Sequence, residues 1–223
     1  MKQPLSSTIK ALISSNKAFI NSNLNSTPKK STQPNTQHNF SALYSSSYFE
    51  SIAESQAPKL LWFGCSDSRT SITTLANIPL NTVFASRNIA NIVSDSDTST
   101  LSILDFAVTA LAIRSIVVCG HTNCGGIINA LKLATSDPPP KSIPKTTAEW
   151  LKPVISLYNS NEKLIGNYET DPLTTTIKMS QFNTFNSVNN IKKHLKLYHP
   201  SIAADICVAA LFLDLRTGLI SPL

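Results

Sequence analysis

Two short apolar runs of the chain each lead directly into polar, metal-binding residue types. Residues 59–64 read KLLWFG and are followed by Cys65, and residues 115–119 read SIVVC and are followed by His121 and Cys124. Continuous apolar runs of this length are typical of strands that are buried on both faces of a sheet. We therefore predict two buried strands with chemically active side chains at their ends.

Helical and strand-like patterns alternate along the rest of the chain. Helical spacing of apolar residues is clearest over 99–112, and residues 97–99 offer polar side chains that could cap this helix. Weaker patterns predict helices over 48–55, 126–133, 148–158 and 175–197 and strands over 82–85 and 206–213. This alternation predicts an α/β fold: a single domain with a mainly parallel central β-sheet flanked by helices.

The N-terminal segment has a different composition from the rest. Apolar residues between Ile9 and Ile20 have roughly helical spacing, and residues 21–39 are rich in Ser, Asn, Pro and Gln. The first pattern fits a targeting helix or a helical arm that packs on a partner, and the second fits a flexible connection. We divide the chain into an N-terminal arm with its polar connection at 1–40 and a domain at 41–223.

The charge of the chain lies mostly in its N-terminal segment. The 223 residues have a net charge of +6, but residues 1–49 contain five Lys and no Asp or Glu. The remainder is almost neutral, so we expect no nucleic-acid partner. The basic cluster around Lys193 lies on a predicted helix and is typical of a solvated face. No apolar run approaches the roughly 20 residues that span a bilayer, so we expect no membrane partner.

The four cysteines fall into two groups. Cys119 and Cys207 lie inside apolar, strand-like runs, where a thiol behaves as a small core residue. Cys65 and Cys124 lie instead where such runs end. Four cysteines without a secretory signal indicate a reducing compartment rather than a disulfide framework.

The residues after the two apolar runs have the chemistry of a metal site. In open α/β sheets, functional groups gather at the carboxyl ends of the strands, so parallel neighbours would bring Cys65, His121 and Cys124 together. One imidazole nitrogen and two sulfurs suit Zn²⁺ and leave a fourth tetrahedral position for water or a substrate. The pattern predicts an open zinc site of the catalytic type.

Two charged residues and two glycines accompany these ligands. Alternation along an extended segment would put Cys65, Asp67 and Arg69 on one side. A carboxylate beside zinc-bound water can accept its proton, and an arginine can keep that carboxylate ionised. Gly125 and Gly126 would let the backbone approach the metal and open a helix whose N–H groups favour an anionic oxygen. In the alternative interpretation, the two cysteines and His121 are buried separately, and Asp67 and Arg69 form a surface salt bridge. The combined pattern disfavours this alternative.

Both motifs closely resemble those of the β-class carbonic anhydrases, zinc enzymes that interconvert CO₂ and bicarbonate. The motifs are CSDSR at 65–69 and HTNCGG at 121–126. The resemblance extends from about Ser14 to Leu219 and includes three further stretches, NKAF at 16–19, SQAPK at 55–59 and RNIAN at 87–91.

The resemblance implies a function and a set of catalytic residues. One zinc ion per chain would be held by Cys65, His121 and Cys124, and Asp67 and Arg69 would form the dyad beside it. The domain at 41–223 would then catalyse the zinc-dependent, reversible hydration of CO₂ to bicarbonate and a proton, through attack of zinc-bound hydroxide on CO₂.

The resemblance also implies substrate contacts and an assembly. Gln56 and Phe84 match positions that line the substrate pocket, and the Gly125 backbone is a further expected contact. Active sites of the family lie at a dimer interface, so we expect a homodimer, with higher assembly left open, and an N-terminal arm that packs on the dimer partner. Because residues 16–19 resemble the family's own helix, we expect a cytoplasmic protein, with mitochondria as the alternative.

Two alternative functions share the same residues. A related zinc hydrolase acting on COS or CS₂ would use the same hydroxide on a different linear molecule. A non-catalytic zinc or thiol-binding module would use Cys65 and Cys124 as reactive thiols, although their separation in sequence differs from a Cys-x-x-Cys redox pair.

A regulatory bicarbonate site is a further expectation from the resemblance. Some members of the family bind bicarbonate in a pocket made by Trp, Gly, Arg and Tyr. Trp62, Gly64 and Arg87 match the first three positions, and Phe106 stands at the position assigned to the Tyr. Thr70 and Ser71 also depart from the apolar residue and Pro that are common in relatives.

Overall fold

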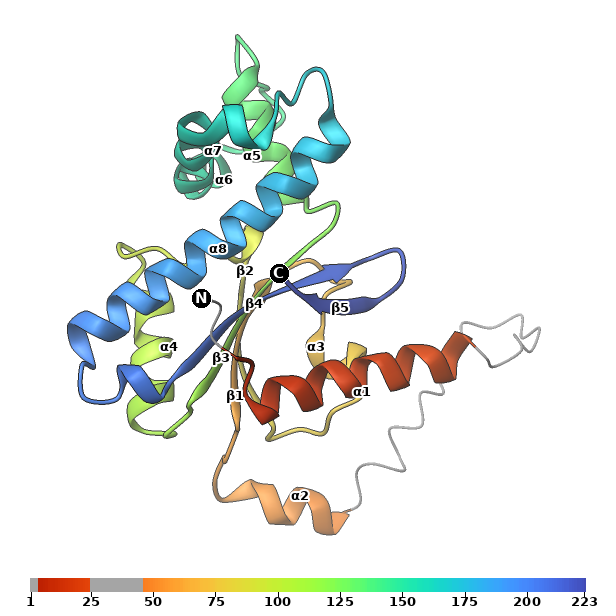
Figure 1. Ribbon diagram of the computed structural model, residues 1–223, viewed down its shortest axis with the longest axis vertical. Coiled ribbons are helices and arrows are strands. Elements are labelled where there is room, and N and C mark those ends of the chain that lie inside the picture. Colours follow the sequence, from red (N-terminus) through yellow and green to blue (C-terminus); the bar gives the residue numbers. More distant parts are fainter. Residues whose placement is uncertain (1–3, 25–45) are drawn as a thin grey trace.

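The computed structural model describes residues 4–24 and 46–223, and a five-stranded sheet lies at its centre (Figure 1). In spatial order the strands are β2 (Val83–Asn88), β1 (Leu60–Cys65), β3 (Ser115–His121), β4 (Cys207–Asp214) and β5 (Leu219–Pro222). The first four run parallel, and β5 is antiparallel to β4. The predicted α/β class with a mainly parallel sheet is confirmed.

The two central apolar runs form the inner strands of this sheet. Every residue of β1 and of β3 is buried, as expected for strands covered on both faces. β2 is longer than the predicted strand at 82–85 and lies at an edge, where its residues are exposed in part. The apolar run over 206–213 forms β4, whereas the pattern gave no indication of β5.

Helices flank the sheet, and most of them match the predicted segments. They are α1 (Ser7–Leu24), α2 (Ser46–Ala53), α3 (Ile72–Leu75), α4 (Thr98–Thr109), α5 (Gly125–Thr135), α6 (Lys145–Trp150), α7 (Lys152–Ile165) and α8 (Pro172–Tyr198), with 3₁₀ turns η2 (Ile89–Asn91) and η3 (Ala203–Asp205). Asp97 caps α4 by accepting a hydrogen bond of 3.1 Å from the Ser99 backbone N–H. None of the described helices is both long and apolar enough to cross a bilayer.

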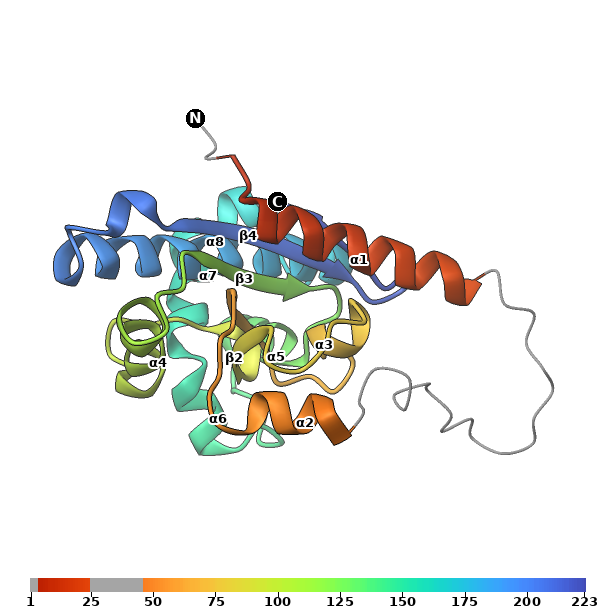
Figure 2. The same cartoon turned by 90° about the horizontal axis from the view of Figure 1, so that it is seen from below.

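Different helices cover the two faces of the sheet. On one face, Leu104 of α4 and Ile191 of α8 share a buried cluster with Phe63 of β1. On the other face, Ile9 of α1 lies in a cluster with Trp62 of β1. Figure 2 shows α1 and α4 well separated, with the sheet between them. Successive β1 side chains therefore point into different cores, as the pleat of a strand requires.

A third buried cluster lies beyond the carboxyl ends of β1 and β3. Ile127 of α5, Tyr158 of α7 and Met179 of α8 pack there with Cys65 and Cys124. The helices that pack against the two thiols, α5, α7 and α8, all follow β3 in the chain. This arrangement shields the strand ends from water on the helical side.

The N-terminal helix α1 packs against the sheet of its own chain. We expected the N-terminal helix to pack on a dimer partner, but Ile9 and Leu12 are buried against the sheet of their own chain. The Asn16 side chain donates 2.9 Å hydrogen bonds to the Leu75 and Gly218 carbonyls and accepts one of 2.9 Å from the Ile220 N–H. These contacts join α1 to its own chain, and the packing of this helix on a dimer partner stays a prediction.

Part of the predicted connection lies outside the described residues. The segment expected to be flexible covers 21–39, and its first four residues belong to α1, whereas 25–39 fall in the part that the structure does not describe. The division of the chain at residues 40 and 41 therefore stays a prediction.

Replacing Asn16 tests how firmly α1 is joined to the sheet. Asn16→Ala removes three hydrogen bonds and leaves the Ile220 N–H without its acceptor, so we expect the free energy of unfolding to fall by about 2–4 kcal/mol. Urea denaturation followed by circular dichroism measures this. Asn21→Ala, at an exposed position of the same helix, is the matched control and should change little. Equal stability of the two variants would contradict the packing of α1.

Candidate metal centre

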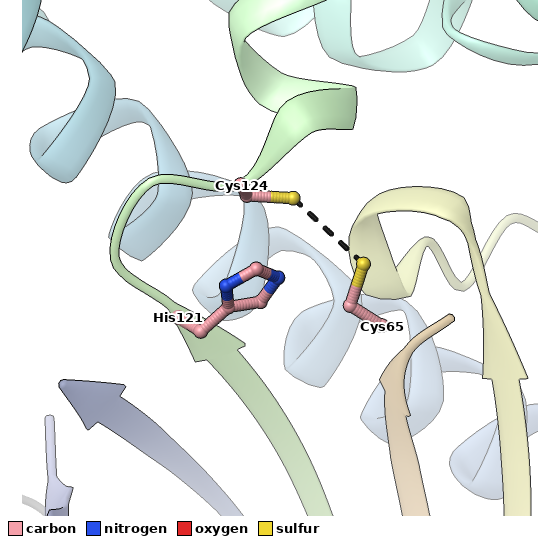
Figure 3. A group of neighbouring side chains, drawn as sticks. All are labelled: Cys65, His121 and Cys124. Atoms are coloured by element: carbon pink, nitrogen blue, oxygen red, sulfur yellow. Dashed lines mark hydrogen bonds between the residues drawn. The ribbon is translucent and has the colours of Figure 1, made fainter. Parts of the chain in front are cut away.

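Three side chains with metal-binding atoms meet where β1 and β3 end. Cys65 is the last residue of β1, His121 is the last of β3, and Cys124 directly precedes α5. Their side chains point toward one another (Figure 3), and the two sulfurs are separated by 3.8 Å. All three possible ligand atoms lie within 4.8 Å of one another. The structure thus brings together the three residues that the sequence predicted as a site.

A tight turn explains how His121 and Cys124 come to face each other. Asn123 has a φ of 54°, in the left-handed region that Asn tolerates better than most residues. Gly126 then allows α5 to begin against η2, because a Cβ there would lie 3.0 Å from the Ala90 Cβ. A Cβ on Gly125 would meet nothing within 4 Å, so the close approach depends on Gly126.

The His121 ring is prepared to bind a metal through one particular nitrogen. Its Nδ1 lies 2.9 Å from the Thr122 carbonyl oxygen, which can only accept, so this nitrogen carries the proton. The buried Nε2 has no hydrogen-bond partner in the described structure. A buried polar atom without a partner is costly, and an unprotonated Nε2 beside two sulfurs is a good ligand for a cation. One imidazole and two cysteine sulfurs therefore fit Zn²⁺.

The two thiols differ in their acidity because they share a hydrogen bond. The bond from Cys124 is the main reason why the pKa of Cys65 is lowered to about 4, against the opposing effect of burial. The same thiol–thiolate contact, together with burial, raises the pKa of Cys124. Without a cation the pair thus favours one thiolate, and a bound divalent cation would favour two.

Asp67 and Arg69 form a two-pronged ion pair beside this cluster. The Arg69 Nε and Nη2 atoms donate to the two carboxylate oxygens of Asp67 at 2.9 and 2.6 Å. The Arg69 backbone N–H adds a third hydrogen bond of 3.0 Å to Oδ1. Chiefly because of the Arg69 hydrogen bonds, the pKa of Asp67 lies well below its usual range. The carboxylate is therefore ionised, oriented and held by the arginine.

Two further residues position the loop that carries this ion pair. The buried Thr70 hydroxyl donates to the Cys65 and Asp67 carbonyls at 3.0 and 2.8 Å. Arg87 on β2 donates to the same two carbonyl oxygens at 2.8 and 2.5 Å. The sequence showed Thr70 only as a departure from the residue common in relatives. Its place directly after the CSDSR motif was the only sequence signal of this supporting role.

Two of the three residues expected to bind substrate, Gln56 and Phe84, lie away from the metal cluster of their own chain. Gln56 is exposed in the loop before β1, at the opposite end of this strand from Cys65. Phe84 pairs with Leu61 near the start of β1, and its ring lies 6.0 Å from that of Phe106. Gly125 is exposed beside Cys124. One chain alone therefore leaves Gln56 and Phe84 away from Cys65.

Trp62 and Phe106, which the resemblance related to a regulatory pocket, lie on opposite faces of the sheet. Trp62 belongs to the buried cluster on the α1 face, and its Nε1 has no hydrogen-bond partner in the described structure. Phe106 lies on α4 and contacts Phe84, which packs against the cluster on the opposite face. Within one chain the sheet therefore separates Phe106 from Trp62, and a bicarbonate pocket of Trp62, Gly64 and Arg87 stays a prediction.

Comparison with known proteins agrees with the fold and the cluster. The family model described as "Carbonic anhydrase" matches residues 60–220, which contain both motifs. The chain is 36% identical over 168 residues to a carbonic anhydrase of Candida albicans, an alignment that covers 75% of this chain and 57% of the relative. The chain belongs to the carbonic anhydrase family, in its β class. It spans little more than half the length of that curated relative.

Solved β-carbonic anhydrases share the architecture. A Coccomyxa β-carbonic anhydrase in complex with acetazolamide is 30% identical with a TM-score of 0.72, covering 83% of this chain and 80% of that one. One of two tetrameric β-carbonic anhydrases from Sordaria macrospora is 29% identical with a TM-score of 0.71 and 98% coverage of both chains. The likeness thus includes the sheet and its surrounding helices.

Substitution of the ligands tests the metal site directly. Cys65→Ser, His121→Ala and Cys124→Ser each remove one of three ligands, so we expect zinc content to fall from about one per chain toward zero. Asp67→Asn should keep its zinc, since Asp67 is engaged by Arg69. Elemental analysis of folded protein measures this, with Cys119→Ala, a buried core thiol, as the matched control. Zinc lost equally from Asp67→Asn would contradict these roles.

Proposed function

We propose that this protein is a zinc-dependent carbonic anhydrase, which catalyses the reversible hydration of CO₂ to bicarbonate and a proton. The observation that carries the proposal is the Cys65, His121 and Cys124 cluster beside a carboxylate that Arg69 holds ionised. When bound, zinc would supply a Lewis acid that makes water a nucleophile near neutral pH. His121 would bind through Nε2, and the two cysteines through their sulfurs.

The chain's own residues would supply orientation and charge. An ionised Asp67 is only an acceptor, so it would orient a water molecule by taking a hydrogen bond from it. Arg69 keeps the carboxylate in place through two side-chain hydrogen bonds. Thr70 and Arg87 hold the backbone carbonyls of the same loop, so the carboxylate has little freedom to turn. Preorganisation of this kind lowers the cost of reaching the transition state.

An activity assay with one isosteric variant tests this function. Purified zinc-loaded protein should accelerate CO₂ hydration in a stopped-flow assay with a pH indicator. Asp67→Asn should keep zinc and lose roughly 10–100-fold in turnover, the usual effect of removing a group that orients a metal ligand. Asp205→Asn, an exposed change of the same kind, is the control.

The same preparation distinguishes the alternative functions. Stoichiometric zinc with hydrolysis of COS or CS₂ and without CO₂ hydration would favour the related hydrolase. Zinc without activity on any of these substrates would favour a non-catalytic binding module. Thiol titration with and without a chelator would then report whether Cys65 and Cys124 react as free thiols.

We further propose that the active protein is a homodimer whose two copies complete each other's sites. Gln56 and Phe84 lie away from Cys65 within one chain, so a second copy is needed if they are to line its pocket. β2 is an edge strand next to β1, and an edge strand offers unpaired backbone groups to another chain. Phe106 and Ile89 nearby are large and exposed, at 47% and 40%.

Mixing two inactive variants tests this composite site. In a heterodimer of Gln56→Ala and Asp67→Asn chains, one of the two sites receives an intact Gln56 and an intact Asp67 from different copies. If equal amounts of the two chains mix at random, about half of the dimers are heterodimers. Each heterodimer has one intact site, so about a quarter of all sites should be active. Co-refolded mixtures assayed for CO₂ hydration measure this. Activity no greater than the average of the two separate variants would contradict the composite site. Gln56 and Asp67 would then act in a site made by one chain, or Gln56 would lie outside the site.

We also propose a cytoplasmic location. Removal of α1 as a targeting segment would expose the core residues that Ile9 and Leu12 cover and would break the Asn16 hydrogen bonds. Retention of α1 is therefore favoured. Imaging of a C-terminally tagged protein tests the location, and a mitochondrial signal with loss of the first residues would overturn it.

A further inference from the structure

A second group of metal-binding side chains joins α4 to the end of α8. The Nε2 atoms of His194 and His199 each lie 2.7 Å from the same carboxylate oxygen, Oδ1 of Asp105. The possible ligand atoms of these three residues all lie within 4.8 Å of one another. α4 and the carboxyl end of α8 come together in this part of the fold (Figure 1). Two imidazoles and one carboxylate form a donor set that divalent transition metals bind well.

The group opens into a cavity that a hydrated ion can enter. Asp105 and His194 line a hollow of about 530 Å³, together with Asp95, Ser102 and Lys193. The two imidazoles are largely buried, with exposed fractions of 10% and 15%, while Asp105 is 43% exposed. The three side chains are thus fixed by packing but remain accessible from one side.

The charges around the cavity favour a cation. Two carboxylates, Asp95 and Asp105, face one ammonium group, Lys193, whose ion pair with Asp95 is long at 3.7 Å and largely exposed. Burial raises the pKa of Asp105, but the hydrogen bonds from His199 and His194 outweigh it and lower the pKa overall. Asp105 is therefore an anion at neutral pH, and no arginine lines the cavity to bind it.

This group is separate from the Cys65, His121 and Cys124 cluster. Met179 packs beside Cys65 and Cys124, and His194 lies fifteen positions further along α8. At 1.5 Å per residue the two places are about 22 Å apart along the helix axis. The second group is therefore too far from the first cluster to belong to the proposed active site.

We propose that Asp105, His194 and His199 form a second divalent-cation site, which takes Zn²⁺ or a chemically similar transition metal. At present both Nε2–H groups donate to Asp105. On binding, each imidazole would move its proton from Nε2 to Nδ1, and the cation would replace the two protons between nitrogen and oxygen. Ligand distances of about 2.0–2.2 Å to Zn²⁺ require the three atoms to separate slightly. The cation would fasten the end of α8 to α4.

Metal stoichiometry of the full-length, untagged protein tests the site. After equilibrium dialysis against excess Zn²⁺, wild type should hold close to two zinc ions per chain and Asp105→Asn close to one. Removal of a direct ligand should weaken the second ion roughly 100-fold or more, since even groups that only orient ligands contribute 10–100-fold. His194→Gln should behave as Asp105→Asn does.

A charge-matched variant keeps this test specific. Asp95→Asn removes the same charge from the same cavity, but Asp95 makes no contact with either imidazole that would be lost. It should therefore retain two ions. Equal loss of the second ion from Asp95→Asn and Asp105→Asn would show diffuse attraction of cations rather than a built site and would overturn the proposal.

Cobalt substitution identifies the ligands of each ion. Co²⁺ bound by thiolates gives an intense sulfur-to-metal charge-transfer absorption, whereas Co²⁺ bound by imidazole and carboxylate gives none. The second equivalent of Co²⁺ should therefore add visible bands without this absorption, and Asp105→Asn should lose those bands only. A single equivalent that always shows the charge-transfer absorption would mean that the histidines and Asp105 form only a hydrogen-bonded cluster.

Discussion

The candidate site depends on the parallel pairing of β1 with β3. This pairing brings the ends of two strands, more than fifty residues apart in the chain, to one edge of the sheet. Cys65 and His121 are the terminal residues of these strands, and a single tight turn adds Cys124. A shift of one residue in either strand would turn its last side chain to the other face of the sheet. Alternate side chains of both strands pack into different clusters on the two faces of the sheet, which favours this register.

A network of backbone contacts then converts three converging residues into an ordered site. The Thr122 carbonyl selects the His121 tautomer, and Thr70 and Arg87 hold the carbonyls of the loop that carries Asp67. None of these contacts involves the side chain of a predicted zinc ligand other than His121. The chemistry of the ligands and their placement are therefore supplied by different residues, as is usual for metal sites whose outer contacts fix the ligand orientation.

The long helix α8 connects the two side-chain clusters of the molecule. Its first half packs beside Cys65 and Cys124, and its last turns carry His194 and lead to His199. In between it covers β3 and β4. A helix packed along its whole length transmits position well, because a close-packed interior leaves few alternative arrangements. The residues beside the proposed active site and those of the second cluster thus lie on one rigid helix.

By itself the sequence determined the class of fold, the buried strands and the Cys65, His121, Cys124 and Asp67–Arg69 set, because periodicity and motif spacing are local properties. Tertiary structure decided what depends on distant contacts. The placement of α1 on its own sheet, the antiparallel β5, the separation of Phe106 from Trp62 and the Asp105–His194–His199 group all join residues far apart in the chain. No pattern within one segment encodes such contacts, since they arise only when packing and strand register select which side chains face each other.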